Sequence, residues 1–323
     1  MTSILLVEDS PTQAATMRLL LERAGHQVIV AGDGLEAIEQ LSALEDVDRP
    51  DLVVSDLQMP NLDGVGLVCE LAKSFPDTPV IVTTVYGSEH LAVDALACGA
   101  VNFVPKNSLA DLLAPVVHRV ARWLAANRRF QPLDGYLRRP EFYFRLNNDI
   151  ASVDLATEYF IETLAAAKQM STTGCLRVAT AVASALFASV CYGNLQLRDD
   201  MDVMQQLLGD DTTSSRSDAL RRWLKSTGRS VDSQRLVRFK VSIGSNDTRV
   251  AVSHDGPTPI AVMNPAPGTP ESFEKEQGRG WMLMTSFMDD VLLSSDGGEV
   301  TMVKKHEQAG EEAPASHARS PAT

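Results

Sequence analysis

The first third of the sequence alternates five short apolar runs with five amphipathic stretches, and this alternation limits the fold more than any other feature. The apolar runs are residues 4–7, 28–31, 52–55, 80–83 and 102–104. The amphipathic stretches are residues 12–24, 35–44, 65–75, 89–98 and 109–124, with helical spacing of their apolar residues. Runs that are apolar throughout indicate strands buried on both faces. The pattern therefore predicts a five-stranded, doubly wound parallel sheet with helices on both sides.

Polar residues follow these runs where each predicted strand ends. Glu8 and Asp9 come directly after the first run, and Asp56 ends the third. Parallel strands end at the same edge of a sheet, so we expect the three carboxylates to meet there. Crowded carboxylates repel each other unless a cation intervenes, and oxygen ligands favour a hard divalent ion such as Mg²⁺. Thr84 and Lys106, at the ends of the fourth and fifth strands, would complete an anion site suited to phosphoryl transfer.

Residues 1–124 closely resemble the receiver domain of bacterial response regulators. The segments that carry the resemblance are LLVEDS, DLQMPNLDG, VIVTTVYG and NFVPK. It implies a flavodoxin-like fold in which Asp56 accepts a phosphoryl group from the phosphohistidine of a sensor histidine kinase. The other implied roles are Mg²⁺ ligation by Glu8, Asp9, Asp56 and the Gln58 backbone carbonyl, phosphoryl contacts from Lys106 and Thr84, and an aromatic switch at Phe103.

Two residues depart from the usual receiver pattern. Val85 follows the switch threonine where the family prefers a smaller residue, which would narrow access to the phosphoryl group. Asn107 follows the lysine where proline is usual, so we expect a different strand-to-helix turn. Both changes are expected to alter rates rather than abolish phosphorylation.

Charge and cysteine content restrict the partners and the compartment. The net charge of −13 argues against general affinity for nucleic acid or anionic membrane. The four cysteines, in apolar contexts and without a CxxC pair, are expected to be buried free thiols in a reducing compartment. The N-terminus does not read as a signal peptide, and the apolar stretch 178–190 is too short for a bilayer span. We expect a soluble cytoplasmic protein.

The composition of the sequence changes after the predicted receiver domain. Residues 125–140 carry arginines, prolines and a glycine and read as a linker, with the arginines at 119–145 on a solvated surface. Residues 141–305 begin with a strand and two helices and end with several strands. This order predicts an α+β two-layer sandwich with helices on one face of a mixed sheet. The polar residues 306–323 are expected to be a disordered tail.

Residues 141–305 resemble the ATP-binding fold shared by histidine kinases, gyrase and the anti-sigma-factor serine kinases, the last group being the nearest likeness. Three segments carry the resemblance: GNL at 193–195, VAVSHDGP at 250–257 and GRGWMLMTSFMDDV at 278–291. It implies that Asp255 accepts the adenine amino hydrogens. The remaining nucleotide-binding positions it implies are Asn194, Gly256 and a phosphate cradle at Gly278, Arg279 and Gly280.

The catalytic positions of this second domain have lost their chemistry. The family places a glutamate base and a Mg²⁺-binding asparagine on the first helix, four residues apart. Ser184 and Ala188 occupy those positions, and Tyr192 replaces the histidine before Gly-Asn. Thr258-Pro259 replaces the usual glycine-aromatic pair. We therefore expect kinase chemistry to be lost, since metal-bridged phosphates supply much of the charge neutralisation in phosphoryl transfer.

Three functions remain after these observations. The first is a response regulator whose Asp56 phosphorylation shifts residues 86–122 and controls partner binding by the second domain. By resemblance, the partner is a sigma factor or a STAS-type anti-sigma antagonist, and residues 86–122 are a candidate homodimer surface. The second is a phosphorylation-gated serine-protein kinase that binds ATP. The third is a phosphate sink whose second domain only oligomerises.

Overall fold

The computed structural model describes most of the chain. The described residues are 2–85, 88–129, 139–197, 201–209, 213–228, 234–257 and 276–306. Three sequence predictions fall at least partly outside them: most of the linker, the Thr258-Pro259 pair and the tail beyond His306.

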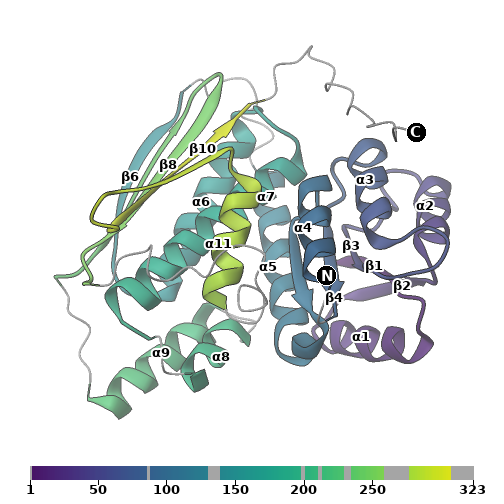
Figure 1. Ribbon diagram of the computed structural model, residues 1–323, viewed down its shortest axis with the longest axis horizontal. Helices are drawn as coiled ribbons and strands as arrows, with labels where there is room; N and C mark the ends of the chain where they lie inside the picture. The colour runs from purple at the N-terminus through teal and green to yellow at the C-terminus, as the bar shows by residue number, and fades with distance from the viewer. Residues whose placement is uncertain are drawn as a thin grey trace, which may run out of the picture.

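The N-terminal domain has the predicted parallel sheet, in the order β2-β1-β3-β4-β5 (Figure 1). Its strands are β1 (Ser3–Val7), β2 (Gln27–Ala31), β3 (Leu52–Asp56), β4 (Val80–Thr84) and β5 (Asn102–Pro105), all paired in parallel. Its helices are α1 (Pro11–Arg23), α2 (Gly34–Ala43), α3 (Gly64–Ser74), α4 (Glu89–Cys98) and α5 (Leu109–Arg129). β3 and β4 are buried along their whole length, as expected for strands covered on both faces. α5 extends past the predicted domain boundary at residue 124, into the predicted linker.

The C-terminal domain has one layer of helices on a five-stranded sheet, in the order β6-β7-β8-β10-β9. The strands are β6 (Glu141–Leu146), β7 (Val237–Ile243), β8 (Asp247–His254), β9 (Asp290–Leu293) and β10 (Glu299–Lys305). The helices are α6 (Ile150–Ala166), α7 (Thr172–Ala188), the π-helix η3 (Ser189–Asn194), α8 (Met201–Gly209), α9 (Thr213–Thr227) and α11 (Glu276–Phe287).

The prediction of a mixed sheet in this domain is wrong, because all of its strand pairs are antiparallel. Short turns connect β7 to β8 and β9 to β10, and a short turn can join only antiparallel neighbours. Alternate residues of β7 and β8 are buried, so one sheet face packs on the helices and the other faces outward.

Among the residues that the structure describes, one helical segment is long and apolar enough to cross a membrane, contrary to the expectation drawn from its central apolar stretch. It runs from Thr172 to Asn194, and 72% of its apolar window is buried inside the protein. That burial makes it the core helix of the C-terminal domain: α7 packs against α6 and α11.

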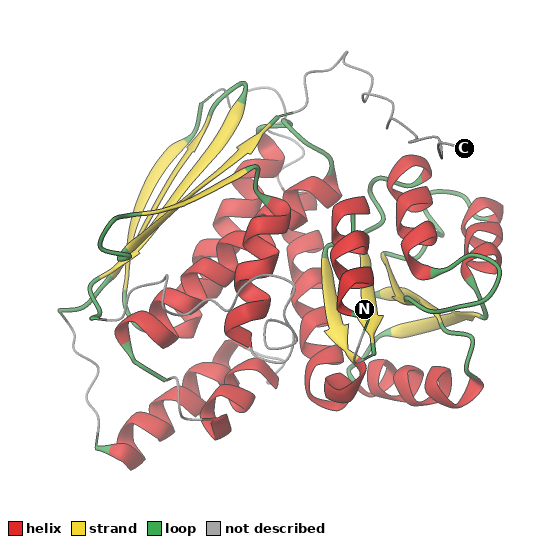
Figure 2. Ribbon diagram, in the orientation of Figure 1, coloured by secondary structure: helices red, strands yellow, loops and turns green. Residues whose placement is uncertain are grey.

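The two domains pack helix against helix, and α5, α7 and α11 lie between the two sheets (Figure 2). α5 contacts α6, α7 and α8, and α4 contacts α11. Arg122 on α5 donates to Glu158 on α6, with Nε to Oε1 at 3.0 Å, and pairs with Asp154. The prediction of a solvated arginine surface is therefore wrong for Arg122, because its charge meets carboxylates across the domain contact.

The prediction of four free thiols is wrong for two cysteines. Cys69 on α3 and Cys98 at the end of α4 form a disulfide, while Cys175 and Cys191 are free and buried. α3 and α4 lie side by side on the sheet, which brings together residues that are 29 positions apart in the sequence. Burial raises the pKa of the Cys175 thiol to about 12, so that thiol stays protonated.

Candidate functional site

The carboxyl edge of the parallel sheet gathers the acidic residues predicted from the sequence. Oxygen atoms of Glu8, Asp9 and Asp56 all lie within 4.8 Å of one another. Glu8 and Asp56 are buried, and Asp9 is exposed. Carboxylate oxygens at this spacing are the ligands that a hard divalent cation takes in proteins. Gln58, whose carbonyl was predicted as a further ligand, is exposed just beyond the end of β3.

Lys106 balances part of this negative charge. Its Nζ lies 2.9 Å from both Asp56 Oδ2 and Glu8 Oε2. Gln13 on α1 holds the same ammonium, with its Oε1 at 2.7 Å from Nζ. Sequence reasoning missed Gln13, because nothing in the pattern of α1 distinguishes it from a solvated helix residue. One ammonium thus connects the first and third strands across the site.

The remaining receiver positions lie on neighbouring strands. Thr84 is buried at the end of β4 and pairs in register with Pro105, directly before Lys106. Phe103 is fully buried in β5, and Val85 is 38% exposed. The predicted hydroxyl therefore lies at the end of β4, the strand next to β3, and the predicted aromatic side chain lies in β5, one strand further along the sheet.

Gly64 allows α3 to approach the phosphoacceptor position. A Cβ atom at Gly64 would lie 2.1 Å from the Asp56 carbonyl oxygen, so no larger residue fits there. Asp63 caps α3 by accepting from the Gly66 N–H at 2.7 Å. The Asp-Gly pair in DLQMPNLDG is the sequence feature that could have indicated this contact. An aspartate before a glycine often marks a helix start where two backbone segments lie close together.

The charge state of Glu8 makes the metal-free site pH-dependent. Burial raises the pKa of Glu8 above its ordinary value of 4.5; the Lys106 hydrogen bond opposes the rise, and the Asp56 charge adds to it. The native state then holds this proton where the unfolded chain has released it. The free energy of unfolding without metal should therefore fall as pH rises through this window.

Glu8→Gln is expected to remove this pH-dependent loss and to raise the free energy of unfolding at neutral pH in the presence of a chelator. The physical reason is that the amide needs no desolvation of a charge. Urea unfolding at a series of pH values measures it, with Glu39→Gln, an exposed glutamate on α2, as the matched control. An unchanged or lower stability of Glu8→Gln at neutral pH would contradict the assignment.

The second predicted site lies where α7, η3, β8 and α11 meet. Ser184, at the position expected for a base, donates its hydroxyl to the Thr180 carbonyl at 2.9 Å. A Cβ atom at Gly280 would lie 3.4 Å from Ser184 Cβ, so α11 packs directly on this face of α7. Ala188 is partly buried at the end of α7. None of these three residues offers a free acid–base group.

The predicted adenine contact is engaged within the protein. Asp255 Oδ2 accepts from the Leu236 N–H at 3.0 Å, and Oδ1 pairs with Arg238 at 2.7 Å. Asn194 is buried, and its Nδ2 donates to Asn148 Oδ1 at 2.7 Å. Both predicted nucleotide contacts thus bond to neighbouring residues, and ATP binding stays a prediction.

The glycine-rich segment is helical rather than a loop before a helix. α11 begins at Glu276, so Gly278, Arg279 and Gly280 lie inside it, and all three are buried. The first four N–H groups of a helix have no partner within that helix. Gly278 and Arg279 are therefore the members of the predicted phosphate cradle whose N–H groups lie in the first turn.

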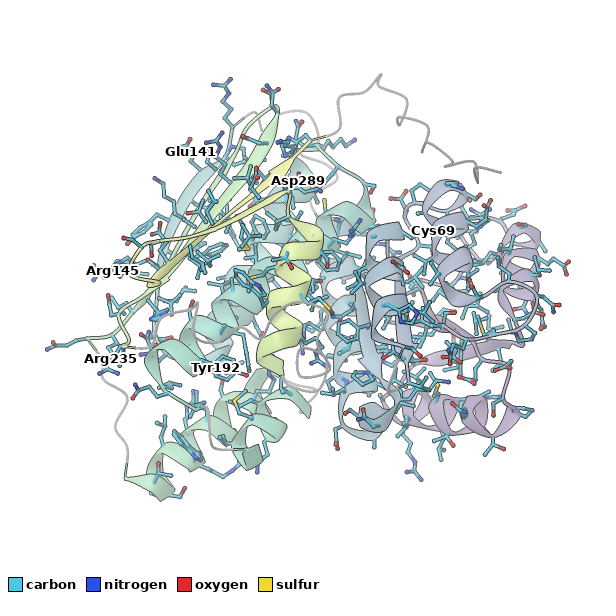
Figure 3. The ribbon with its side chains drawn as sticks, in the orientation of Figure 1. Cys69, Glu141, Arg145, Tyr192, Arg235 and Asp289 are labelled. Carbon is cyan, nitrogen blue, oxygen red and sulfur yellow. A yellow bond between two sulfur atoms is a disulfide. The ribbon has the colours of Figure 1, made fainter. Side chains whose placement is uncertain are left out.

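Two glycines allow close backbone contact between η3 and the end of β8, where Gly193 and Gly256 meet. A Cβ at Gly256 would lie 1.8 Å from the Gly193 carbonyl oxygen, and a Cβ at Gly193 would meet the His254 ring at 2.7 Å. Figure 3 labels Tyr192, which is buried in the same π-helix. The GN and DG motifs therefore serve a backbone contact between the two predicted nucleotide segments.

Gly256→Ala is expected to lower the free energy of unfolding by roughly 3 kcal/mol, because a backbone-to-backbone overlap has no flexible side chain to relieve it. Gly298→Ala is the matched control, since the nearest atom to its Cβ would lie at an ordinary 3.5 Å. Chemical denaturation of both variants measures the difference. Equal stability of the two variants would show that β8 and η3 do not touch at this point.

Two parts of the chain match known protein families. Residues 4–117 match the response regulator receiver domain, and residues 224–304 match the histidine kinase-like ATPase domain. The C4-dicarboxylate transport transcriptional regulatory protein DctD of Pseudomonas aeruginosa is 36% identical over 130 residues, or 39% of this chain and 27% of that protein. The response regulator MprA of Mycolicibacterium vanbaalenii is 36% identical over 133 residues, or 41% of this chain and 53% of that protein. The chain thus spans between a quarter and about half of the length of these curated relatives.

Solved receiver domains are similar to the N-terminal part. The receiver domain of NtrX from Brucella abortus is 30% identical and covers 36% of this chain and 95% of its own, with a TM-score of 0.34. The signal receiver domain of a histidine kinase from Syntrophus aciditrophicus is 34% identical and covers 40% of this chain and 93% of its own, also with a TM-score of 0.34.

Proposed function

This chain carries a response regulator receiver domain joined to a histidine kinase-like ATPase domain, and we propose that phosphorylation of Asp56 controls partner binding by the second domain. The observation that carries the proposal is the contact of α4 and α5 with the C-terminal helices. Because α4 and α5 already contact the second domain, a movement of these helices on phosphorylation would act on that domain directly.

The chemistry at Asp56 follows from the donors around it. An Asp56 oxygen attacks the phosphorus of a phosphohistidine, the P–N bond breaks, and the imidazole nitrogen keeps the bonding electrons. When bound, Mg²⁺ neutralises charge on the transferring group; the carboxylates of Glu8, Asp9 and Asp56 would hold it, together with the Gln58 backbone carbonyl. Lys106 already contacts Asp56 and would shift to a phosphoryl oxygen.

The signal would then pass along α4. Thr84 ends β4 directly before the segment that leads into α4, so a hydroxyl drawn to the phosphoryl group pulls on the start of that helix. At its other end, the Leu96 carbonyl accepts from Arg177 Nη2 at 2.8 Å, and the Val101 carbonyl accepts from the Thr180 hydroxyl at 3.5 Å. A shift of α4 and β5 therefore acts directly on α7.

The second domain acts in this proposal by binding a protein rather than by catalysis. Its expected base and metal positions hold Ser184 and Ala188, and α11 packs on that face. Sigma factors and STAS-type anti-sigma antagonists are the partner classes that the resemblance to anti-sigma kinases suggests.

Partner binding with and without a phosphoryl mimic tests the proposal. The full chain loaded with beryllofluoride and Mg²⁺ is expected to change its affinity for one of the host's sigma factors or STAS-domain proteins, and Asp56→Asn to show no change. Equal binding by the loaded and unloaded wild-type chain would count against partner control by phosphorylation.

A further inference from the structure

The outer edge of β6 is an open edge of the antiparallel sheet. β6 is the first strand of the antiparallel sheet, and no strand among the described residues pairs with its outer side. Figure 3 shows Glu141 and Arg145 toward opposite ends of this strand, on the side away from the receiver domain. Open edges rich in β-forming residues associate readily, so proteins usually protect them or pair them.

The hydrogen-bonding pattern shows which backbone groups of β6 face outward. The Pro140 carbonyl accepts from the Ile243 N–H at 3.0 Å, and Glu141 pairs in register with Ser242. Hydrogen-bonded pairs alternate along an antiparallel ladder. The N–H and C=O groups of the odd-numbered residues of β6 therefore point away from β7. These residues are Glu141, Tyr143 and Arg145.

The side chains of β6 are self-complementary in one antiparallel register. Pairing Tyr143 with Tyr143 of a second copy places Glu141 opposite Arg145 on the outer face of the sheet. It also places Phe142 opposite Phe144 on the inner face. The three outward-facing residues of each strand would then form hydrogen-bonded pairs, each exchanging two N–H···O bonds. A two-fold axis requires such self-complementarity.

Exposed apolar residues beside the edge extend this surface. The Tyr159 ring on α6 lies 5.2 Å from Phe142 and 5.5 Å from Phe144 between ring centroids, and Tyr159 is 49% exposed. Leu155, one turn earlier on α6, is 66% exposed. A second copy on β6 would bring its own α6 toward these residues and cover apolar area.

We infer that the chain forms a two-fold symmetric dimer in which β6 pairs antiparallel with β6 of a second copy, centred on Tyr143. The two five-stranded sheets become one continuous sheet. The homodimer surface predicted from the sequence, residues 86–122, is instead covered largely by the chain's own C-terminal helices. This dimer does not depend on phosphorylation, so it stands or falls separately from the proposed function.

Charge exchange across β6 tests the dimer by sedimentation equilibrium of the full chain. The wild-type chain is expected to be dimeric at micromolar concentration. Glu141→Arg and Arg145→Glu each create two like-charge contacts and are expected to raise the dissociation constant by roughly tenfold or more. The double variant, Glu141→Arg with Arg145→Glu, restores opposite charges and is expected to recover dimerisation. Lys240→Glu, exposed on the outer face of β7, is the matched control.

Tyr143→Pro provides a second arm, because it removes an outward-facing N–H that no strand in the described part of the chain uses. Circular dichroism confirms that each variant is folded, and Tyr143→Pro is expected to be monomeric. A monomeric wild-type chain would overturn the inference. So would single charge variants that dimerise like the wild type, or a double variant that stays monomeric.

Discussion

Asp56→Asn is expected to abolish incorporation of phosphate from acetyl phosphate in the presence of Mg²⁺. Asp56 lies within 2.9 Å of Lys106 and beside two other carboxylates, and it is the acceptor that this geometry presents at the strand end. An amide oxygen is a much weaker nucleophile than a carboxylate and forms no acyl phosphate. Electrophoresis in a phosphate-binding gel, or intact-mass spectrometry, measures the adduct.

Asp48→Asn is the matched control for this experiment, because Asp48 is an exposed aspartate away from the strand ends. It is expected to incorporate phosphate like the wild type. A phosphorylated Asp56→Asn chain would mean that the acceptor lies elsewhere, and the assignment of the first site would be wrong.

Arg177→Ala is expected to have the largest effect on the contact between the domains. The guanidinium donates to the Leu96 carbonyl on α4 at 2.8 Å and to the Ser286 carbonyl on α11 at 3.4 Å. It also lies over the Phe287 ring, 4.8 Å from the centroid. Of these contacts, only the bond to Leu96 crosses the domain contact, while Ser286 and Phe287, in the same domain as Arg177, hold the guanidinium in place. A hydrogen bond from a charged donor contributes about 2 kcal/mol.

Burial of the guanidinium charge reduces this stabilisation and lowers the pKa of Arg177. The negative charge of Asp289 acts in the opposite direction and raises that pKa. Figure 3 labels Asp289, which lies between α11 and β9. Limited proteolysis of the full chain is expected to cleave Arg177→Ala faster than the wild type at the domain contact. Arg177→Lys keeps the charge but not the planar guanidinium that lies over the Phe287 ring, so an intermediate rate is expected. Arg18→Ala, which removes an exposed pair on α1, is the control; equal rates for Arg177→Ala and Arg18→Ala would exclude a coupling role.

The site in the receiver half was predictable from the sequence because its functional residues lie at the ends of strands. Glu8, Asp56 and Lys106 each follow an apolar run, and parallel topology alone brings them to one edge. The contribution of Gln13 was not predictable, since it depends on where α1 crosses the sheet. The Cys69–Cys98 disulfide depends in the same way on the lateral packing of α3 and α4, which spacing along the chain does not encode.

The second half was predictable in its elements and less so in its contacts. The strands and helices follow from periodicity, whereas the direction of the strands in the sheet depends on the lengths of the turns that connect them. The engagement of Asp255 by Arg238 joins the end of β8 to β7, and no local pattern indicates it. The role of Arg177 could not be predicted from the sequence either, because its bond to Leu96 forms only when one domain docks on the other.

Hydrogen–deuterium exchange of the full chain, with and without beryllofluoride and Mg²⁺, measures whether phosphorylation at Asp56 reaches the C-terminal helices. We predict faster exchange in α4, α7 and α11 when the wild-type chain carries the phosphoryl mimic, and no change in Asp56→Asn. Identical exchange in loaded and unloaded wild-type chain, with the mimic shown to be bound at Asp56, would contradict it.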